Sequence, residues 1–141
     1  MCDSYLYQEH LNQAGGDCPP KDGYQPINQT VIRIVFEEGH PKAENNFVPV
    51  GLISPKRLDQ ATDEFERCQM FGLSFFQTLE QARKRLVGIK NFEQKLGTHL
   101  AQVVVIEKDG IASKTDRNGH ITFHPCSNVE WIIIKPLIPA I

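Results

Sequence analysis

The side chains with the greatest potential for chemistry gather near the end of the chain, in residues 113–124. Asn118 and Gly119 tolerate the positive φ that a tight turn requires, and they separate two segments rich in β-compatible residues. The pattern therefore predicts a β-hairpin in which two histidines and several hydroxyl side chains lie close together. Side chains of these types can transfer protons, bind metal ions or activate a nucleophile.

Two loop lengths fit this hairpin. A two-residue loop pairs Arg117 with His120, whereas a four-residue loop pairs Thr115 with His120. Because side chains alternate along a strand, both registers place the same polar side chains on one face of the hairpin and apolar ones on the other. The polar face consists of Ser113, Thr115, His120, Thr122 and His124.

Strand geometry argues against a metal ion held by both histidines of this face. His120 and His124 are four residues apart, which corresponds to roughly 13 Å along a strand. A zinc ligand must approach the metal to about 2.1 Å, so one ion would need a ligand from another strand, for which His99 is the candidate. We therefore expect no metal site, and the alternative for this face is a solvated sheet surface.

A Cys or Ser paired with His could also serve as the nucleophile of a hydrolase. Cys126 lies two residues beyond His124, but Pro125 between them argues against a continuous strand. No third group that would orient the pair is evident from the sequence. We therefore expect Cys126 to be structural.

Arg33 is the one charged residue in a β-branched run, residues 31–36, that predicts a strand. Such a charge usually marks an edge or a solvent-exposed face of a sheet. The functional alternative is an anion clamp, because a planar guanidinium matches a phosphate or carboxylate in a bidentate manner. The sequence leaves both interpretations open.

Composition limits the class of protein. A chain of 141 residues with 40% hydrophobic and 23% charged residues predicts a single globular domain, and the net charge of −2 argues against general nucleic-acid binding. No apolar segment suggests a signal peptide or a membrane span. The four cysteines form no C-x-x-C pair, so a reduced, cytoplasmic setting is the simplest expectation. Residues 1–26 read as an irregular leader, and residues 27–141 as the folded domain.

The hydrophobic patterns along the rest of the chain predict an α+β order of strands and helices. Strands are expected at 31–36, 47–53, 71–76, 100–107 and 129–134, the second interrupted by proline and the last stopped by Pro136 and Pro139. One helix is expected to begin at Ser54 and Pro55, with Leu58, Ala61, Phe65 and Cys68 on one face. Another begins at a Thr78–Gln81 capping box and extends to residue 96, with a possible break at Gly88. The expected fold is a mixed, mostly antiparallel twisted sheet of six to seven strands with two main helices and a C-terminal β-hairpin.

The second helix carries a basic face that offers a further candidate surface. A solvated helix face is the simplest explanation for it, and contact with RNA or an acidic partner is the alternative. Its members are Arg83, Lys84, Arg85, Lys90 and Lys95.

The order of elements resembles that of small, uncharacterised bacterial proteins and, loosely, the ADP-ribosyltransferase-like fold. The resemblance spans residues 27–139. It rests on Arg33 in the first strand, Gly72, Leu73 and Ser74 before a Thr-capped helix, a valine-rich strand, the hairpin with Gly119 and His120, and a closing strand with Glu130, Trp131 and residues 132–134.

This resemblance implies a soluble protein that binds NAD, or a related nucleotide, as a substrate. Arg33 would bind the phosphates and Thr122 would join the cofactor-binding face. Ser74 would support the catalytic site, Glu130 would contact the ribose and stabilise the oxocarbenium-like sugar, and His120 would assist as an acid–base group. The alternative is a non-enzymatic module that binds a protein or RNA partner through the hairpin and the basic helix.

Overall fold

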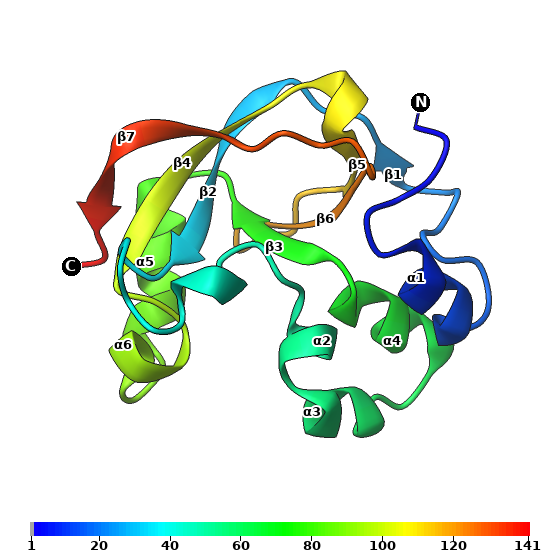
Figure 1. Ribbon diagram of the computed structural model, residues 1–141, viewed down its shortest axis with the longest axis horizontal. Coiled ribbons are helices and arrows are strands. Elements are labelled where there is room, and N and C mark those ends of the chain that lie inside the picture. The colour runs from blue at the N-terminus through cyan, green and yellow to red at the C-terminus, as the bar shows by residue number, and fades with distance from the viewer. Residues whose placement is uncertain (1) are drawn as a thin grey trace.

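The computed structural model describes residues 2–141 and contains one antiparallel sheet of seven strands in the order β1-β5-β6-β3-β2-β4-β7 (Figure 1). The strands are β1 (Tyr24–Gln25), β2 (Gln29–Val35), β3 (Leu73–Phe76), β4 (His99–Val105), β5 (Gly110–Ser113), β6 (His120–Pro125) and β7 (Ile132–Pro139). The α+β class is therefore confirmed. Each strand pair is antiparallel, so the expectation of a mixed sheet is wrong.

The structure contains six short helices where two main ones were expected. They are α1 (Gln8–Ala14), α2 (Val50–Ile53), α3 (Pro55–Asp59), α4 (Glu64–Met70), α5 (Leu79–Val87) and α6 (Phe92–Lys95), and 3₁₀ turns occur at Ala43–Asn45 and Glu107–Asp109. Within residues 2–141, no helix combines the length and the apolar character needed to cross a membrane.

Thr78 is confirmed as the N-cap of α5, but the capping box is incomplete, because the Gln81 side chain accepts from the Thr78 hydroxyl rather than from the Thr78 backbone N–H. The Thr78 hydroxyl accepts a hydrogen bond from the backbone N–H of Gln81, which satisfies one of the free donors of the first turn. Gly88 follows the last residue of α5, and the chain resumes a helix only at α6, so the expected break occurs. Ala82 and Leu86 are buried on the inner side of α5.

The region before β3 differs most from the sequence prediction. The expected strand at 47–53 is wrong, because Pro49 precedes the short helix α2 and Phe47 packs its ring on Trp131 at 4.7 Å. The expected single helix after Ser54 is also wrong. It ends with α3, and a new helix, α4, starts where the Asp63 carboxylate accepts from the backbone N–H of Glu66.

The predicted hairpin corresponds to β5 and β6, joined by a loop that includes the turn. Ala112 pairs with Phe123, but at the turn the backbone N–H of Asp116 donates to the carbonyl of His120. Asp116 therefore lies opposite His120, and the loop matches neither of the two expected lengths. Gly119 has φ of 76° and donates its N–H to the carbonyl of Asp116, which closes the turn.

The last strand does not end where the sequence predicted. β7 continues through Pro136 to Pro139, and its pairing with β4 shifts between Leu100 and Gln102. Proline is compatible with β7 because this strand forms an edge of the sheet, where one side of the backbone needs no partner.

The sheet is packed on both faces. One face forms a cluster of fully buried aliphatic and aromatic side chains around Phe75 and Phe123, against which Trp131 packs. The other face packs Ile32, Phe76 and Leu100 against the apolar side of α5. Adjacent residues of β2 and β3 thus point to opposite clusters, as strand alternation requires.

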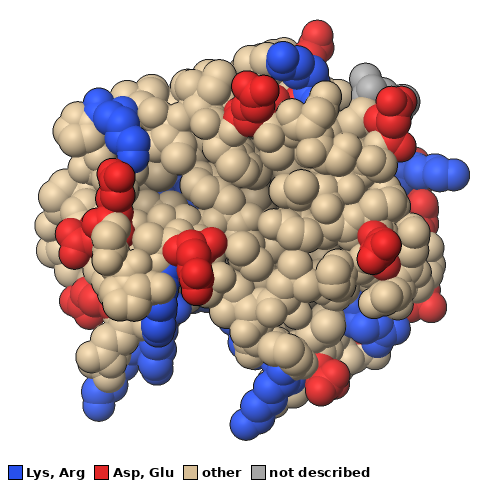
Figure 2. Space-filling view, in the orientation of Figure 1, with Lys and Arg blue, Asp and Glu red and all other residues tan. Residues whose placement is uncertain are grey.

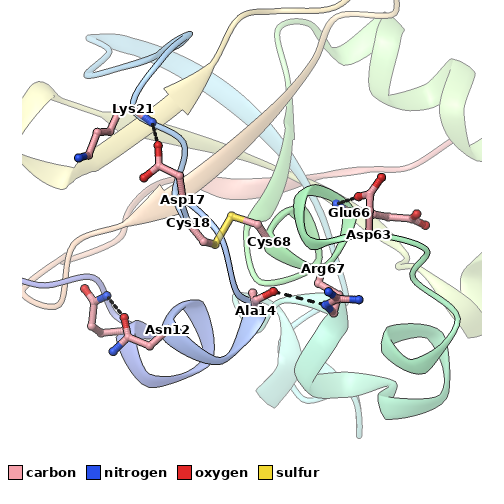
Figure 3. The surroundings of a disulfide bond; sticks show 10 residues. Asn12, Ala14, Asp17, Cys18, Lys21, Asp63, Glu66, Arg67 and Cys68 are labelled. Carbon is pink, nitrogen blue, oxygen red and sulfur yellow. Dashed lines mark hydrogen bonds between the residues drawn. A yellow bond between two sulfur atoms is a disulfide. The ribbon is translucent and has the colours of Figure 1, made fainter.

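A third, smaller cluster joins the N-terminal segment to the helices before β3. Leu11 and Ala14 of α1 are buried with Cys68 and Phe71, and Arg67 donates to the carbonyl of Ala14 (Figure 3). Residues 2–26, which the sequence analysis treated as a leader, therefore include a helix packed on the domain.

All four cysteines are paired, which corrects the expectation of a reduced protein. Cys18 and Cys68 form the disulfide beside α1 and α4 that Figure 3 shows, and Cys2 pairs with Cys126 at the end of β6. Cys126 is structural, as predicted, but through a disulfide bond, and Cys68 is buried in the third cluster and also disulfide-bonded. Sequence spacing could not indicate this because the partners are 50 and 124 residues apart.

Candidate functional site

A cavity of about 510 Å³ opens where β2 and β3 diverge. The two strands share only the pair Ile32 and Phe76, so Arg33 and Ile34 on one strand and Ser74 on the other border the opening. Figure 2 shows the molecule hollowed on this side, with basic side chains projecting on both sides of the hollow. We call this cavity the basic cleft.

The charge of the basic cleft is one-sided. Five Lys or Arg side chains line it, and its lining includes no Asp or Glu. The cationic residues are Arg33, Lys42, Arg57, Arg85 and Lys95. No lysine or arginine in residues 2–141 forms a salt bridge, so these charges lack an internal carboxylate partner. The protein as a whole carries a net charge of −2, which makes this local excess of positive charge a specific feature.

Arg33 fills the fork between the two strands. Its Nε donates to the carbonyl of Asn46 at 3.0 Å, and its Nη1 donates to the carbonyl of Ser74 at 3.0 Å. The side chain of Asn46 in turn pairs with both backbone groups of Phe36, which ties the loop after β2 to the end of that strand. Burial lowers the pKa of Arg33 to about 10, and the nearby Tyr7 opposes this shift. Arg33 remains charged at neutral pH and replaces the missing β2–β3 hydrogen bonds.

Ser74 and His120 form a hydrogen-bonded pair at the floor of the basic cleft. The Ser74 hydroxyl lies 2.9 Å from Nε2 of His120, because antiparallel pairing of β3 with β6 brings the two residues to one face. Ser74 is exposed, so a bound molecule can reach its hydroxyl. The other ring nitrogen of His120, Nδ1, lies 3.9 Å from Oδ2 of Asp116.

The environment of His120 favours a neutral imidazole. Burial is the largest cause and lowers the pKa of His120 below its ordinary value of 6.5. Asp116 raises this pKa, whereas Arg85 and Arg33 lower it. A neutral histidine next to a hydroxyl can act as a proton acceptor at neutral pH.

The polar face of the hairpin is not a solvated surface beyond His120. Thr122 is buried, and His124 is only 1% exposed, with no hydrogen-bond partner for either ring nitrogen within the described chain. Burial lowers the pKa of His124 to about 4. The expectation of a solvated face is therefore wrong for this half, because β1 and the segment before β3 pack over it. The Tyr24 ring lies 5.8 Å from that of His124, and a side chain at Gly72 would collide with Thr122.

A second, more open hollow adjoins the basic cleft. Its volume is also about 510 Å³, and Gln69 and His120 line both hollows. It differs in character because Asp22 and Asp116 supply two carboxylates and Tyr24 and Phe65 supply aromatic rings. His120 thus lies where a basic and a more acidic hollow meet.

The structure brings together four of the five residues that the sequence singled out. Arg33, Ser74 and His120 line the basic cleft, and Thr122 lines the second hollow. Glu130 is exposed in the segment before β7 and lines neither hollow. Its neighbour Trp131 packs on the opposite face of the sheet from α5, against Phe75 and Phe123.

The basic helix face of the sequence analysis divides into groups with different surroundings. Arg85 and Lys95 line the basic cleft, whereas Arg83 donates to the carbonyls of Pro139 and Ala140. The side chains therefore do not form one continuous surface.

Several residues of the site were missed by sequence reasoning. Lys42, Asn46 and Arg57 lie in segments expected to be a loop and a helix far from the hairpin, and only the fold brings them to the cleft. Asp116 lies in the turn of the predicted hairpin. It does hold the turn, because Oδ1 accepts from the backbone N–H groups of Asn118 and His120, but this leaves Oδ2 facing the imidazole.

Within residues 2–141, no group of three or more His, Cys, Asp or Glu side chains is arranged to hold an ion.

Comparison of this chain with protein-family models, with curated proteins and with solved structures found no match.

Proposed function

We propose that this protein binds a phosphate-bearing nucleotide, of the NAD class, in the basic cleft. The observation that carries the proposal is the charge of the lining, which has five cationic side chains and no carboxylate in a protein of net negative charge. Phosphate groups are recognised by such clusters of guanidinium and ammonium groups.

The cations of the cleft have different roles in this proposal. Arg33 is committed to two backbone carbonyls, and Lys42 donates to the carbonyl of Gln94. Arg57, Arg85 and Lys95 make no side-chain hydrogen bond or salt bridge within residues 2–141, so their donors are available to an anion. They come from α3, α5 and α6, on the two sides of the hollow in Figure 2, and would hold a phosphate chain between them.

The size and the apolar part of the cleft suit the remainder of a nucleotide. Its volume of about 510 Å³ falls within the range of roughly 300–1,000 Å³ typical of small-molecule sites. Phe36, Phe76 and Val48 also line it and offer surfaces for a base or a sugar. Phosphates on the basic rim and a ring on the apolar walls would use both kinds of surface.

ADP-ribosyltransferase-like chemistry would need a carboxylate near the ribose. Glu130 lies outside the cleft lining, so it does not support that reaction. Asp116, which lines the adjoining hollow, is the carboxylate beside His120. The proposal therefore concerns nucleotide binding, with Ser74 and His120 as the reactive groups at the floor of the site.

The alternative of an interaction module has less support. Half of its hairpin surface is buried at Thr122 and His124, and its basic helix is divided between the cleft and the C-terminal segment. A protein or RNA partner would then contact mainly the rim of the basic cleft.

The melting temperature in the presence of ligands tests the proposal. A ligand at about 100 times its dissociation constant stabilises the folded state by about 2.7 kcal/mol, which raises the melting temperature by several degrees for a chain of this size. We expect such a shift with NAD and ADP and none with adenosine, which lacks phosphate. Equal melting temperatures with and without millimolar NAD and ADP would overturn the proposal.

The two disulfides also bear on the compartment. Disulfides persist in oxidising compartments and are rare where glutathione and thioredoxin keep thiols reduced. We therefore propose that the protein acts in an oxidising environment rather than in the cytoplasm, since all four of its cysteines are paired. Free thiols counted by mass spectrometry after alkylation of protein taken directly from its native cells would test this.

A further inference from the structure

We propose that Ser74 is a nucleophile activated by His120 and oriented through Asp116, and that the site cleaves carboxylic esters of anionic molecules. This activity goes beyond nucleotide binding and rests on a different observation, the mutual geometry of three side chains. Sequence reasoning found no third group for such an arrangement. The fold supplies it from the turn between β5 and β6.

The first requirement is a hydroxyl in contact with a base. The Ser74 hydroxyl is 2.9 Å from Nε2 of His120, within the range typical of a nucleophile and its general base. Ser74 is exposed and lines the basic cleft, so its oxygen can approach a bound carbonyl carbon. The neutral state that burial favours for His120 is the state that can accept the proton.

The second requirement is a group that fixes the imidazole and stabilises its protonated form. Asp116 Oδ2 lies 3.9 Å from Nδ1 of His120, beyond hydrogen-bond distance but close enough for an ion pair once the ring is protonated. The Asp116 carboxylate is itself held in place, because its Oδ1 accepts from the N–H groups of Asn118 and His120 at 2.8 and 3.0 Å. In the tautomer with its proton on Nδ1, the ring faces the carboxylate with N–H and the serine with a lone pair.

The surroundings indicate the charge of the substrate. Arg33 donates to the backbone carbonyl of Ser74, so a positive charge lies beside the residue that carries the nucleophile. The basic cleft would bind the anionic part of the substrate, and the second hollow, which shares His120, would hold the other side of the ester. The reacting bond would then lie over Ser74 and His120.

The reaction balances without a cofactor. Ser74 Oγ forms a bond to the ester carbonyl carbon while its proton moves to Nε2 of His120. The bond between that carbon and the alcohol oxygen then breaks, and the alcohol leaves with the proton from His120. Water, deprotonated by His120, attacks the acyl-serine, which releases the carboxylic acid and restores the Ser74 hydroxyl.

A biotin-linked ethyl fluorophosphonate tests the proposal without knowledge of the substrate. Its phosphorus forms a bond to an activated serine oxygen, fluoride leaves, and the proton goes to the base. We expect one label per protein, located on the peptide that contains Ser74, and no label on S74A. H120Q should slow labelling by about 100-fold or more, because it removes the general base. D116N should slow it by a smaller factor.

The matched control is S127A. Ser127 is exposed, and its hydroxyl accepts a hydrogen bond from that of Ser4, with no histidine partner within residues 2–141, so it has no base. This variant should be labelled at the wild-type rate. The labelling rate should also rise with pH to a plateau with a midpoint below 6.5, a profile that H120Q loses and that a purely structural hydrogen bond would not produce.

The outcomes separate clearly. Labelling of Ser74 that depends on His120 supports the proposal. The absence of labelling, a label elsewhere that survives in S74A, or labelling of Ser74 at an unchanged rate in H120Q would overturn it. Circular dichroism and thermal melting of each variant show whether it is folded. A failure to bind NAD would contradict the proposed nucleotide function but not the proposed role of Ser74.

Discussion

Arg33 donates a hydrogen bond of 3.0 Å from Nη1 to the backbone carbonyl of Ser74, across the point where β2 and β3 separate. A second bond of the same length from Nε reaches the carbonyl of Asn46. One side chain thus closes the floor of the basic cleft and holds the loop that forms its wall. The sequence allowed Arg33 to be either an edge residue or an anion clamp. In the structure, its side chain first of all bridges two backbone segments.

Replacement of Arg33 should destabilise the protein. R33M keeps the apolar stem but leaves the carbonyls of Ser74 and Asn46 without their charged donor, and hydrogen bonds to charged groups contribute about 1.5–3 kcal/mol each. Chemical denaturation should show a loss of about 3 kcal/mol. The matched variant R83M removes two longer bonds, of 3.3 and 3.2 Å, to the carbonyls of Ala140 and Pro139, and should cost less. Equal losses in the two variants would contradict the bridging role.

His124 should make the stability of the protein fall in mild acid. Its folded-state pKa is lowered to about 4, from 6.5, so the folded state binds the proton less readily than the unfolded state. The corresponding stability is present above pH 6.5, and it is lost as the pH falls toward about 4, by about 3 kcal/mol in total. Denaturation curves recorded between pH 7 and pH 4 measure this loss.

H124L isolates that contribution. Both ring nitrogens of His124 are buried without a partner, so an apolar side chain of similar size should fit at no cost at pH 7 and should flatten the pH dependence. H10Q, which changes a histidine of α1, serves as the control. Strong destabilisation of H124L at pH 7 would contradict this prediction, because it would show that the imidazole makes a stabilising contact in the folded protein.

The disulfide between Cys18 and Cys68 should contribute substantially to stability. It closes a loop with a sequence separation of 50 residues and ties the third, small cluster to α4. Removal of a native disulfide of this kind typically costs about 2–5 kcal/mol. C18A/C68A should therefore unfold at clearly lower denaturant concentration than the wild type. A reducing agent should lower the stability of the wild type but leave the stability of C2A/C18A/C68A/C126A unchanged. Insensitivity of the wild type to reduction would contradict the pairing.

Local signals in the sequence predicted local structure well. The N-cap at Thr78, the turn at Gly119 and the strand around Arg33 depend on neighbouring residues, and they occur as expected. The segment with Pro49 was misjudged, because its apolar residues serve a short helix and a contact with Trp131 that alternation cannot reveal.

The candidate site could be predicted only in part, because contacts between residues far apart in the sequence assemble it. Ser74 and His120 share a face because β3 pairs with β6, a pairing that no local pattern specifies. Arg57 and Lys42 reach the cleft only through tertiary packing, and Glu130 is excluded from it for the same reason. The paired cysteines are 50 and 124 residues apart, so their bonding depends on the fold.

The affinity of NAD for a cleft variant tests the central claim most directly. R57Q/R85Q removes two guanidinium groups that line the basic cleft, whereas K56Q/K84Q removes the same total charge from the adjacent positions, which do not line it. Isothermal titration should show NAD binding to the wild type and to K56Q/K84Q with similar affinity. Binding to R57Q/R85Q should be weakened by about 100-fold or more, since each of the two lost charged contacts costs about 1.5 kcal/mol or more. Absence of NAD binding to the wild type, or equal affinity in the two double variants, would contradict the assignment of the basic cleft as a nucleotide site.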